Sequence, residues 1–136
     1  AIIPADVYAL NTIYNIYFTK ATLLDLRFVL AVVSSRLLRW YWEREFFDRK
    51  ETFPKIKKDS LLEIPLPKLD LDERGASAKH KQVVELVDKM TKLTAALSVA
   101  KVDREKDTLS NAISKADHDI DRALYRLYGL TAEEIA

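Results

Sequence analysis

The chain has 136 residues, of which 49% are hydrophobic and 32% are charged, and its net charge is +1. This balance is typical of a soluble globular protein with one domain, or with a small domain and a helical extension. The absence of cysteine excludes a disulfide scaffold and a thiolate metal site, and it fits the cytoplasmic location that we expect. Only two glycines and four prolines occur, which disfavours a turn-rich all-β architecture. The longest uncharged apolar run, 28–33, is too short to span a bilayer, so we expect no membrane contact.

The first 20 residues are rich in β-branched and aromatic side chains, above all in the stretch 13–18. This composition predicts one or two strands. A two-stranded piece is only marginally stable by itself, so we expect it to pack on further strands upstream of Ala1. Without those strands, the stretch 13–18 would expose apolar surface.

A helix is predicted over residues 22–48, with Thr22 as its N-cap. Side chains at helical spacing form its expected inward stripe, namely Leu26, Leu30, Val33, Leu37 and Trp40. Further apolar side chains surround that stripe, including Phe28, Val29, Leu38, Tyr41 and Trp42. A helix that is apolar on most sides is expected to be buried.

Residues 49–78 are predicted to be irregular. The stretches 52–58 and 64–67 look extended because of their prolines, with one helical turn between them at 59–63. The polar stretch that follows contains Gly75 and is predicted to be a linker.

Two heptad seams follow, over residues 79–130. The first consists of Val83, Leu86, Met90, Leu93, Leu97 and Ala100, and the second of Leu109, Ile113, Ala116, Ile120, Ala123, Leu127 and Leu130. Their phases differ, which predicts a turn near 100–106, with Asp103 as the next N-cap, and hence an antiparallel hairpin with arms of roughly 35–40 Å. One bent helix with a stutter remains the alternative, because the turn has no glycine or proline. Gly129 is expected to end the last helix, and Thr131 to start a final turn.

Catalytic motifs are missing from the sequence. Its glycines are too few and too far apart for a nucleotide-binding loop, and no methyltransferase double proline, nuclease acid cluster or nucleophile elbow occurs. The stretch 117–121 begins like a calcium loop, but Arg122 replaces the turn glycine and Tyr128 the bidentate glutamate. His80 and His118 are isolated and are interpreted as surface residues. We therefore expect no catalysis, metal or cofactor in this chain.

Weaker evidence for DNA binding lies between residues 36 and 58, which contain eight basic and four acidic residues with aromatic residues among them. Such a mixture suits phosphate contacts beside a packed platform. Spacing alone favours the plainer interpretation, in which the aromatic side chains are core and the charges face solvent.

Three motifs follow one another along the chain: VSSRLLRWY at the end of 28–41, TFPKIKK with LEIPLP at 52–67, and IDRALYRLYGLT at 120–131. Together they resemble the TaqI-like C-terminal specificity domain of restriction–modification enzymes. Residues 28–41, which end in VSSRLLRWY, are similar to the family's Leu-Asn-Ser-Lys-Leu helix, with Ser34 in place of the usual Asn. The pair TFPKIKK at 52–58 and LEIPLP at 62–67 is similar to its Phe-Pro-basic-Ile stretch and Leu-Pro-Ile-Pro element. The most specific likeness is IDRALYRLYGLT at 120–131, where Ala123 replaces a larger aliphatic residue.

This resemblance implies a DNA sequence-specificity segment that positions double-stranded DNA for an upstream adenine-N6 methyltransferase, with or without a nuclease. S-adenosylmethionine is the cofactor expected for that parent enzyme, and none is expected here. Much of the recognition sheet would precede Ala1, so many base-reading residues would lie outside the chain. The residues expected to touch phosphate, because their segment looks irregular and exposed, are Arg49, Lys50, Lys55, Lys57 and Lys58.

The predicted fold is therefore mainly α with a small β part, in which a buried helix with short strands precedes a long antiparallel helical hairpin. Residues 1–70 form the recognition part, 71–78 a linker and 79–136 the hairpin, which spaces or docks the recognition part. The alternative function is a helical interaction module used only for docking or dimerisation, with a second copy of the chain as a candidate partner.

Overall fold

The structure is a computed structural model that describes residues 14–17, 24–46 and 57–135. Of the described residues, 75% are helical and none is in a strand. The helical fold and the long hairpin are thus confirmed, whereas the small β part is not seen. Residues 14–17 have no regular structure, and Tyr14, Ile16 and Tyr17 are 51%, 52% and 73% exposed. A strand needs ladder hydrogen bonds from a neighbour, and this short stretch has none. The rest of the stretch expected to form strands lies outside the described residues.

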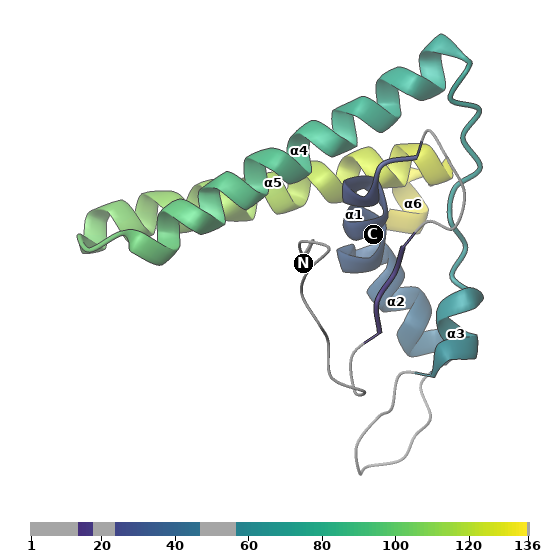
Figure 1. Ribbon diagram of the computed structural model, residues 1–136, viewed down its shortest axis with the longest axis horizontal. Coiled ribbons are helices and arrows are strands. Elements are labelled where there is room, and N and C mark those ends of the chain that lie inside the picture. Colours follow the sequence, from purple (N-terminus) through teal and green to yellow (C-terminus); the bar gives the residue numbers. More distant parts are fainter. Residues whose placement is uncertain (1–13, 18–23, 47–56, 136) are drawn as a thin grey trace. The chain divides into compact units, whose positions relative to one another are not determined.

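The chain divides into two compact units, Ala1–Leu66 and Pro67–Ala136. In the first unit, the single helix expected over 22–48 is instead two helices, α1 (Leu26–Ser34) and α2 (Arg36–Glu45), which contact each other (Figure 1). Ser35 separates them in an extended conformation, with φ −72° and ψ 154°. Its hydroxyl donates to the Val32 carbonyl at 2.7 Å and accepts from the Leu38 amide at 3.1 Å. One buried side chain therefore closes α1 and caps α2.

The start and the inward face of this region also differ from the prediction. Asp25, not Thr22, caps α1: its carboxylate accepts from the Arg27 amide at 2.8 Å and pairs with the Arg27 guanidinium at 2.6 Å. The buried side chains are Phe28, Val29, Ala31, Val32 and Leu38. The predicted stripe is half-buried, except at Trp40, which is exposed. Apolar residues occur on every side of α1, so spacing could not select the face that packs.

A single short helix, α3 (Lys58–Leu62), stands where one helical turn was predicted. Residues 64–70 have no regular secondary structure, as expected for a stretch with two prolines. Helix α4 begins at Arg74, so the last five residues of the predicted linker are helical. Gly75 is tolerated there because it lies in the first turn, beside the good helix formers Ala76 and Ala78.

In the second unit, α4 (Arg74–Val99) packs along α5 (Asp103–Tyr128) as an antiparallel hairpin (Figure 1). Each helix has 26 residues, or about 39 Å at 1.5 Å per residue. Ala100 and Val102 are extended at the turn, with ψ of 131° and 130°, a conformation that needs no glycine. The hairpin is confirmed and the bent helix excluded, although Val102 occupies the N-cap position predicted for Asp103.

The predicted seams run along this hairpin with uneven burial. Val83, Ala116, Ile120 and Ala123 are buried, whereas the seam residues nearer the turn are half-buried, namely Leu93, Leu97, Leu109 and Ile113. Leu86, Leu127 and Leu130, at the other end of the hairpin, are half-buried as well, and two residues outside the predicted seams, Val87 and Leu124, are buried. Two helices alone cannot enclose an apolar seam completely.

The end of α5 follows the sequence prediction closely. Gly129 adopts φ +70° and ψ 25°, its amide donates to the Arg126 carbonyl, and the Leu130 amide donates to the Tyr125 carbonyl at 3.0 Å. This arrangement is a Schellman-type cap. A final turn, α6 (Ala132–Ile135), begins after Thr131, whose hydroxyl and amide both bond the Glu134 carboxylate.

Candidate nucleic-acid interface

Two of the five predicted phosphate-binding residues are described, and both are exposed. Lys57 precedes α3 in an extended conformation, and Lys58 is the first residue of that helix. The positive end of a helix dipole lies at this position, so the two ammonium groups gain nothing from α3. They remain available to an external anion. Arg49, Lys50 and Lys55 lie outside the described residues.

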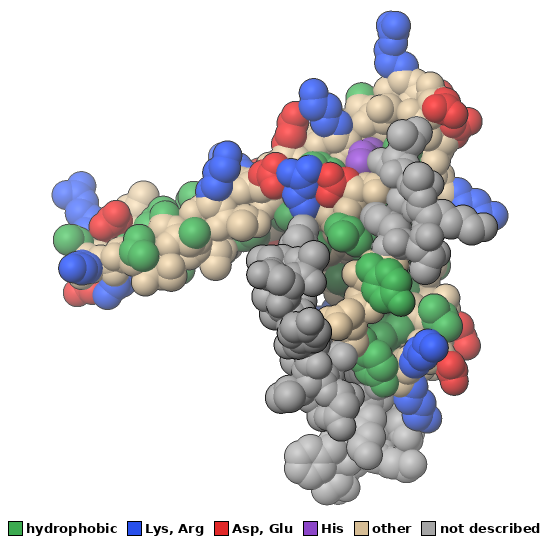
Figure 2. All heavy atoms as spheres, in the orientation of Figure 1, with side chains coloured by type: hydrophobic (Ala, Val, Ile, Leu, Met, Phe, Trp, Pro, Cys, Tyr) green, Lys and Arg blue, Asp and Glu red, His purple; other side chains and the backbone are tan. Residues whose placement is uncertain are grey.

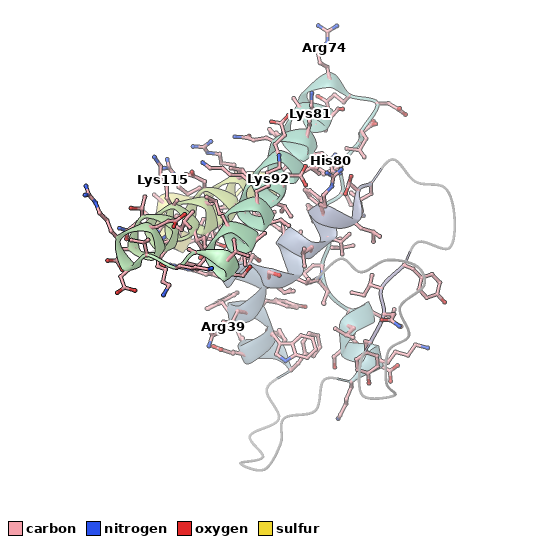
Figure 3. All side chains as sticks on the ribbon, turned by 60° about the vertical axis from the view of Figure 1, so that its left-hand side comes forward. Arg39, Arg74, His80, Lys81, Lys92 and Lys115 are labelled. Carbon is pink, nitrogen blue, oxygen red and sulfur yellow. The ribbon has the colours of Figure 1, made fainter. Side chains whose placement is uncertain are left out.

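The exposed side of α2 gathers a larger set of charges. At 100° per residue, five of its six exposed residues fall within one arc of about 140°, and these are Arg36, Arg39, Trp40, Glu43 and Arg44; the sixth, Glu45, lies outside the arc. We call this set the α2 face. Figure 3 shows Arg39 projecting from its helix into solvent. Three guanidinium groups and one carboxylate make the face cationic.

Two pairings lie within the α2 face, and a third joins it to Glu45, whose carboxylate lies 3.9 Å from the Arg44 Nε. The Arg39 Nε donates to Glu43 at 3.2 Å across one helical turn. The Arg44 guanidinium lies over the Trp40 ring, 5.5 Å from its centroid. The exposed fractions of the Arg39 and Arg44 side chains are 80% and 69%, so both cations face water despite these pairings.

The aromatic residues of this region divide into two groups. Tyr41 and Trp42 are half-buried and pack on Phe46, with ring centroids 5.8 and 4.9 Å apart. Trp40 is 56% exposed. The plainer interpretation of the sequence is therefore right for the packed group and wrong for Trp40. Counting helical turns afresh from Ser35, rather than from Thr22, would have placed Trp40 with the arginines.

Elsewhere the described residues include no group of three His, Asp or Glu side chains able to hold a metal ion. Asp117 is exposed, Asp119 half-buried and Asp121 buried, so these carboxylates do not converge, as their helical spacing predicted. His80 is half-buried and His118 exposed.

Figure 2 shows cationic and anionic side chains alternating along the hairpin, with no patch of a single charge sign on the visible face. Among the described helices, none combines the length and the hydrophobicity that a transmembrane span requires.

Residues 1–66 match the family model of the TaqI-like C-terminal specificity domain. The match ends at Leu66, the residue at which the first compact unit also ends. It covers the α2 face, Lys57 and Lys58, and it excludes the hairpin and the segment 120–131. No curated protein and no solved structure matches the chain.

Proposed function

Since residues 1–66 belong to the TaqI-like C-terminal specificity domain family, we propose that this chain is a DNA sequence-specificity segment of a restriction–modification enzyme. The observation that carries the proposal is the coincidence of the family match with one compact unit, whose described surface presents Lys57, Lys58 and the α2 face to solvent. Exposed cations beside aromatic side chains suit contact with a nucleic-acid backbone.

In this proposal Lys57 and Lys58 contact phosphate. Phosphate contacts fix the position and orientation of a protein on the duplex, while base contacts select the sequence. Arg49, Lys50 and Lys55 belong to the same basic stretch of sequence and are proposed to join them.

The chemistry is proposed to come from an upstream adenine-N6 methyltransferase, with or without a nuclease, and S-adenosylmethionine would be the cofactor of that partner. The specificity segment would hold the DNA, and the α4–α5 hairpin would space or dock it against the catalytic part. Catalysis is not assigned to any residue of this chain.

The second candidate function is an interaction module that docks or dimerises without touching DNA. It is favoured by the hairpin turn, where Val99 and Val102 are 73% and 61% exposed. Exposed aliphatic side chains at the end of a helical hairpin suit contact with another protein.

Fluorescence anisotropy with random-sequence duplex DNA separates the two functions. At low salt we expect the chain to bind, and the affinity to fall steeply as salt rises, because phosphate contacts release counterions. The double variant Lys57→Glu with Lys58→Glu should weaken binding. The matched control, Lys92→Glu with Lys101→Glu, makes the same net-charge change on the hairpin and should weaken it less.

Failure of the wild-type chain to bind duplex DNA at low salt would contradict the DNA-binding function and favour the docking module. Sedimentation equilibrium then tests that module directly, because an apolar hairpin interface gives a dimer whose dissociation constant hardly depends on salt.

A further inference from the structure

We infer that the α2 face is a second contact surface for the phosphate backbone of duplex DNA, centred on the stacked pair of Trp40 and Arg44. The inference rests on the proposed function and adds to it a rigid helical surface that the basic stretch 49–58 does not include. Its role is to position the duplex rather than to select bases.

The charge of the face points to a polyanion. Arg36, Arg39 and Arg44 share it with a single acidic residue, Glu43, and all are exposed. Every other residue of α2 is buried or half-buried, except Glu45, which lies opposite Arg36 on the helix and whose carboxylate comes within 3.9 Å of the Arg44 Nε. The cations are therefore concentrated on one side of the helix.

The exposure of Trp40 is not explained by the packing of the described residues. Its neighbours Tyr41 and Trp42 pack on Phe46, but Trp40 keeps 56% of its surface in water. Arg44 lies over its ring, and the guanidinium side chain remains 69% exposed. A stacked guanidinium has already lost part of its rotamer freedom, so capture of a phosphate by its hydrogen-bonding edge costs less entropy.

Glu43 holds Arg39 in place in the absence of a ligand. Their single bond, from Nε at 3.2 Å, joins two side chains that are 80% and 59% exposed. Such surface pairs contribute little stability, so a phosphate can take over the guanidinium at small cost. The carboxylate also repels the incoming phosphate, and its removal should therefore strengthen DNA binding.

A protein partner suits the α2 face less well. Tryptophan and arginine are common at the centres of protein interfaces, but those centres are depleted in charge and rich in apolar area. On this face Trp40 is the single apolar side chain among four charged ones. Its exposed guanidinium groups are instead the kind of donor that contacts phosphate oxygens.

Quenching of tryptophan fluorescence tests the contact at Trp40 itself. The chain has two tryptophans, so Trp42→Phe leaves Trp40 as the only emitter, while an aromatic ring remains against Phe46. Acrylamide quenching of this variant is measured with and without saturating random duplex at low salt. We expect the duplex to lower the quenching constant at least about twofold, because the backbone would cover an exposed ring.

Charge variants supply the second readout, in the 136-residue chain. Arg39→Gln with Arg44→Gln should weaken duplex binding at least about tenfold, the value of one charge-assisted hydrogen bond, and should lower the slope of log affinity against log salt by about 2. Glu43→Gln should tighten binding more than the matched control Glu105→Gln, a neutralisation of an exposed glutamate on α5. Circular dichroism checks that each variant is folded. If Trp42→Phe fails to fold, Trp40→Phe serves instead as the comparison: the part of the duplex effect on wild-type quenching that this variant loses is the protection of Trp40.

The outcomes separate this inference from the function on which it rests. Duplex binding that depends on Lys57 and Lys58, with no protection of Trp40 and an unchanged salt slope in the arginine variant, overturns the inference and leaves the proposed function standing. No duplex binding at low salt overturns both. If Glu43→Gln and Glu105→Gln changed the duplex affinity equally, the effect would reflect the net charge of the chain alone. That result would also count against the α2 face as a contact surface.

Discussion

Replacing Ser35 by alanine tests the physical reason for the break between α1 and α2. The side chain is 5% exposed and makes two hydrogen bonds, one to the Val32 carbonyl and one from the Leu38 amide. Alanine removes both bonds and leaves the buried Leu38 amide without its acceptor, whereas the Val32 carbonyl still accepts from the backbone amide of residue 35 at 3.2 Å. The extended ψ of 154° gives alanine no helical conformation from which its high helix propensity could profit.

The expected loss follows from these two bonds. Removal of an N-cap side chain costs about 1 kcal/mol, and loss of a further intramolecular hydrogen bond costs about 1 kcal/mol. The Ser35→Ala variant should therefore lose about 2 kcal/mol of the free energy of unfolding of this region. The neighbouring Ser34 is exposed and ends α1, so Ser34→Ala should change that free energy by less than about 0.5 kcal/mol.

Urea denaturation followed by tryptophan fluorescence measures this loss, because both tryptophans of the chain lie in α2. Circular dichroism, dominated by the two long helices of the hairpin, serves as the second probe. The reasoning would be refuted if Ser35→Ala and Ser34→Ala shifted the fluorescence transition equally, or if Ser35→Ala lost less than about 0.5 kcal/mol.

Three further predictions concern the second unit. Gly129→Ala should lower the free energy of unfolding by about 1 kcal/mol, because the φ of Gly129 is +70°. Gly75→Ala should be neutral or stabilising, because a Cβ there would meet no atom nearer than 3.8 Å and alanine is the better helix former. Thermal melts compare the two variants, and equal losses of stability would contradict this reasoning. Hydrogen bonds from Thr131 lower the pKa of Glu134 below its ordinary value of 4.5. The cap that these bonds form is therefore present above pH 4.5 and is lost as the pH falls through the lower pKa of the folded state. The NMR shift of the Thr131 amide should titrate with a midpoint below pH 4.5, and a midpoint at 4.5 would be evidence against the cap. Burial raises the pKa of Tyr128 from 10.0 to about 12. The stability that the buried, protonated phenol contributes is therefore present below pH 10.0 and is lost as the pH rises towards 12. A titration of tyrosinate absorbance should show a last step that Tyr128→Phe removes, and persistence of that step in the variant would count against its assignment to Tyr128.

The hairpin could be predicted from local sequence patterns. Apolar side chains at heptad spacing specify a helix and its packing face together, and the change of phase between the two seams requires a break. Gly129 and the pair of Thr131 and Glu134 likewise act through bonds to their own neighbours, so the end of α5 and the start of α6 could be predicted without tertiary information. The resemblance that led to the family is also a property of linear motifs, and it is confirmed over residues 1–66.

Tertiary structure decided the region that carries the candidate site. Between Leu26 and Trp42 almost every position is apolar or long enough to cover apolar surface, so spacing selects no single inward face. The choice came from burial: Phe28, Val32 and Leu38 are buried, and a buried Ser35 satisfies its hydroxyl by breaking the helix. That break sets the phase of α2, and the phase of α2 places Trp40 beside the arginines in solvent. The sequence does not predict the helix break at Ser35, because the cost of burying an unpaired hydroxyl arises only once the chain has packed around it. The exposure of Trp40 depends on that break, so it could not be predicted either.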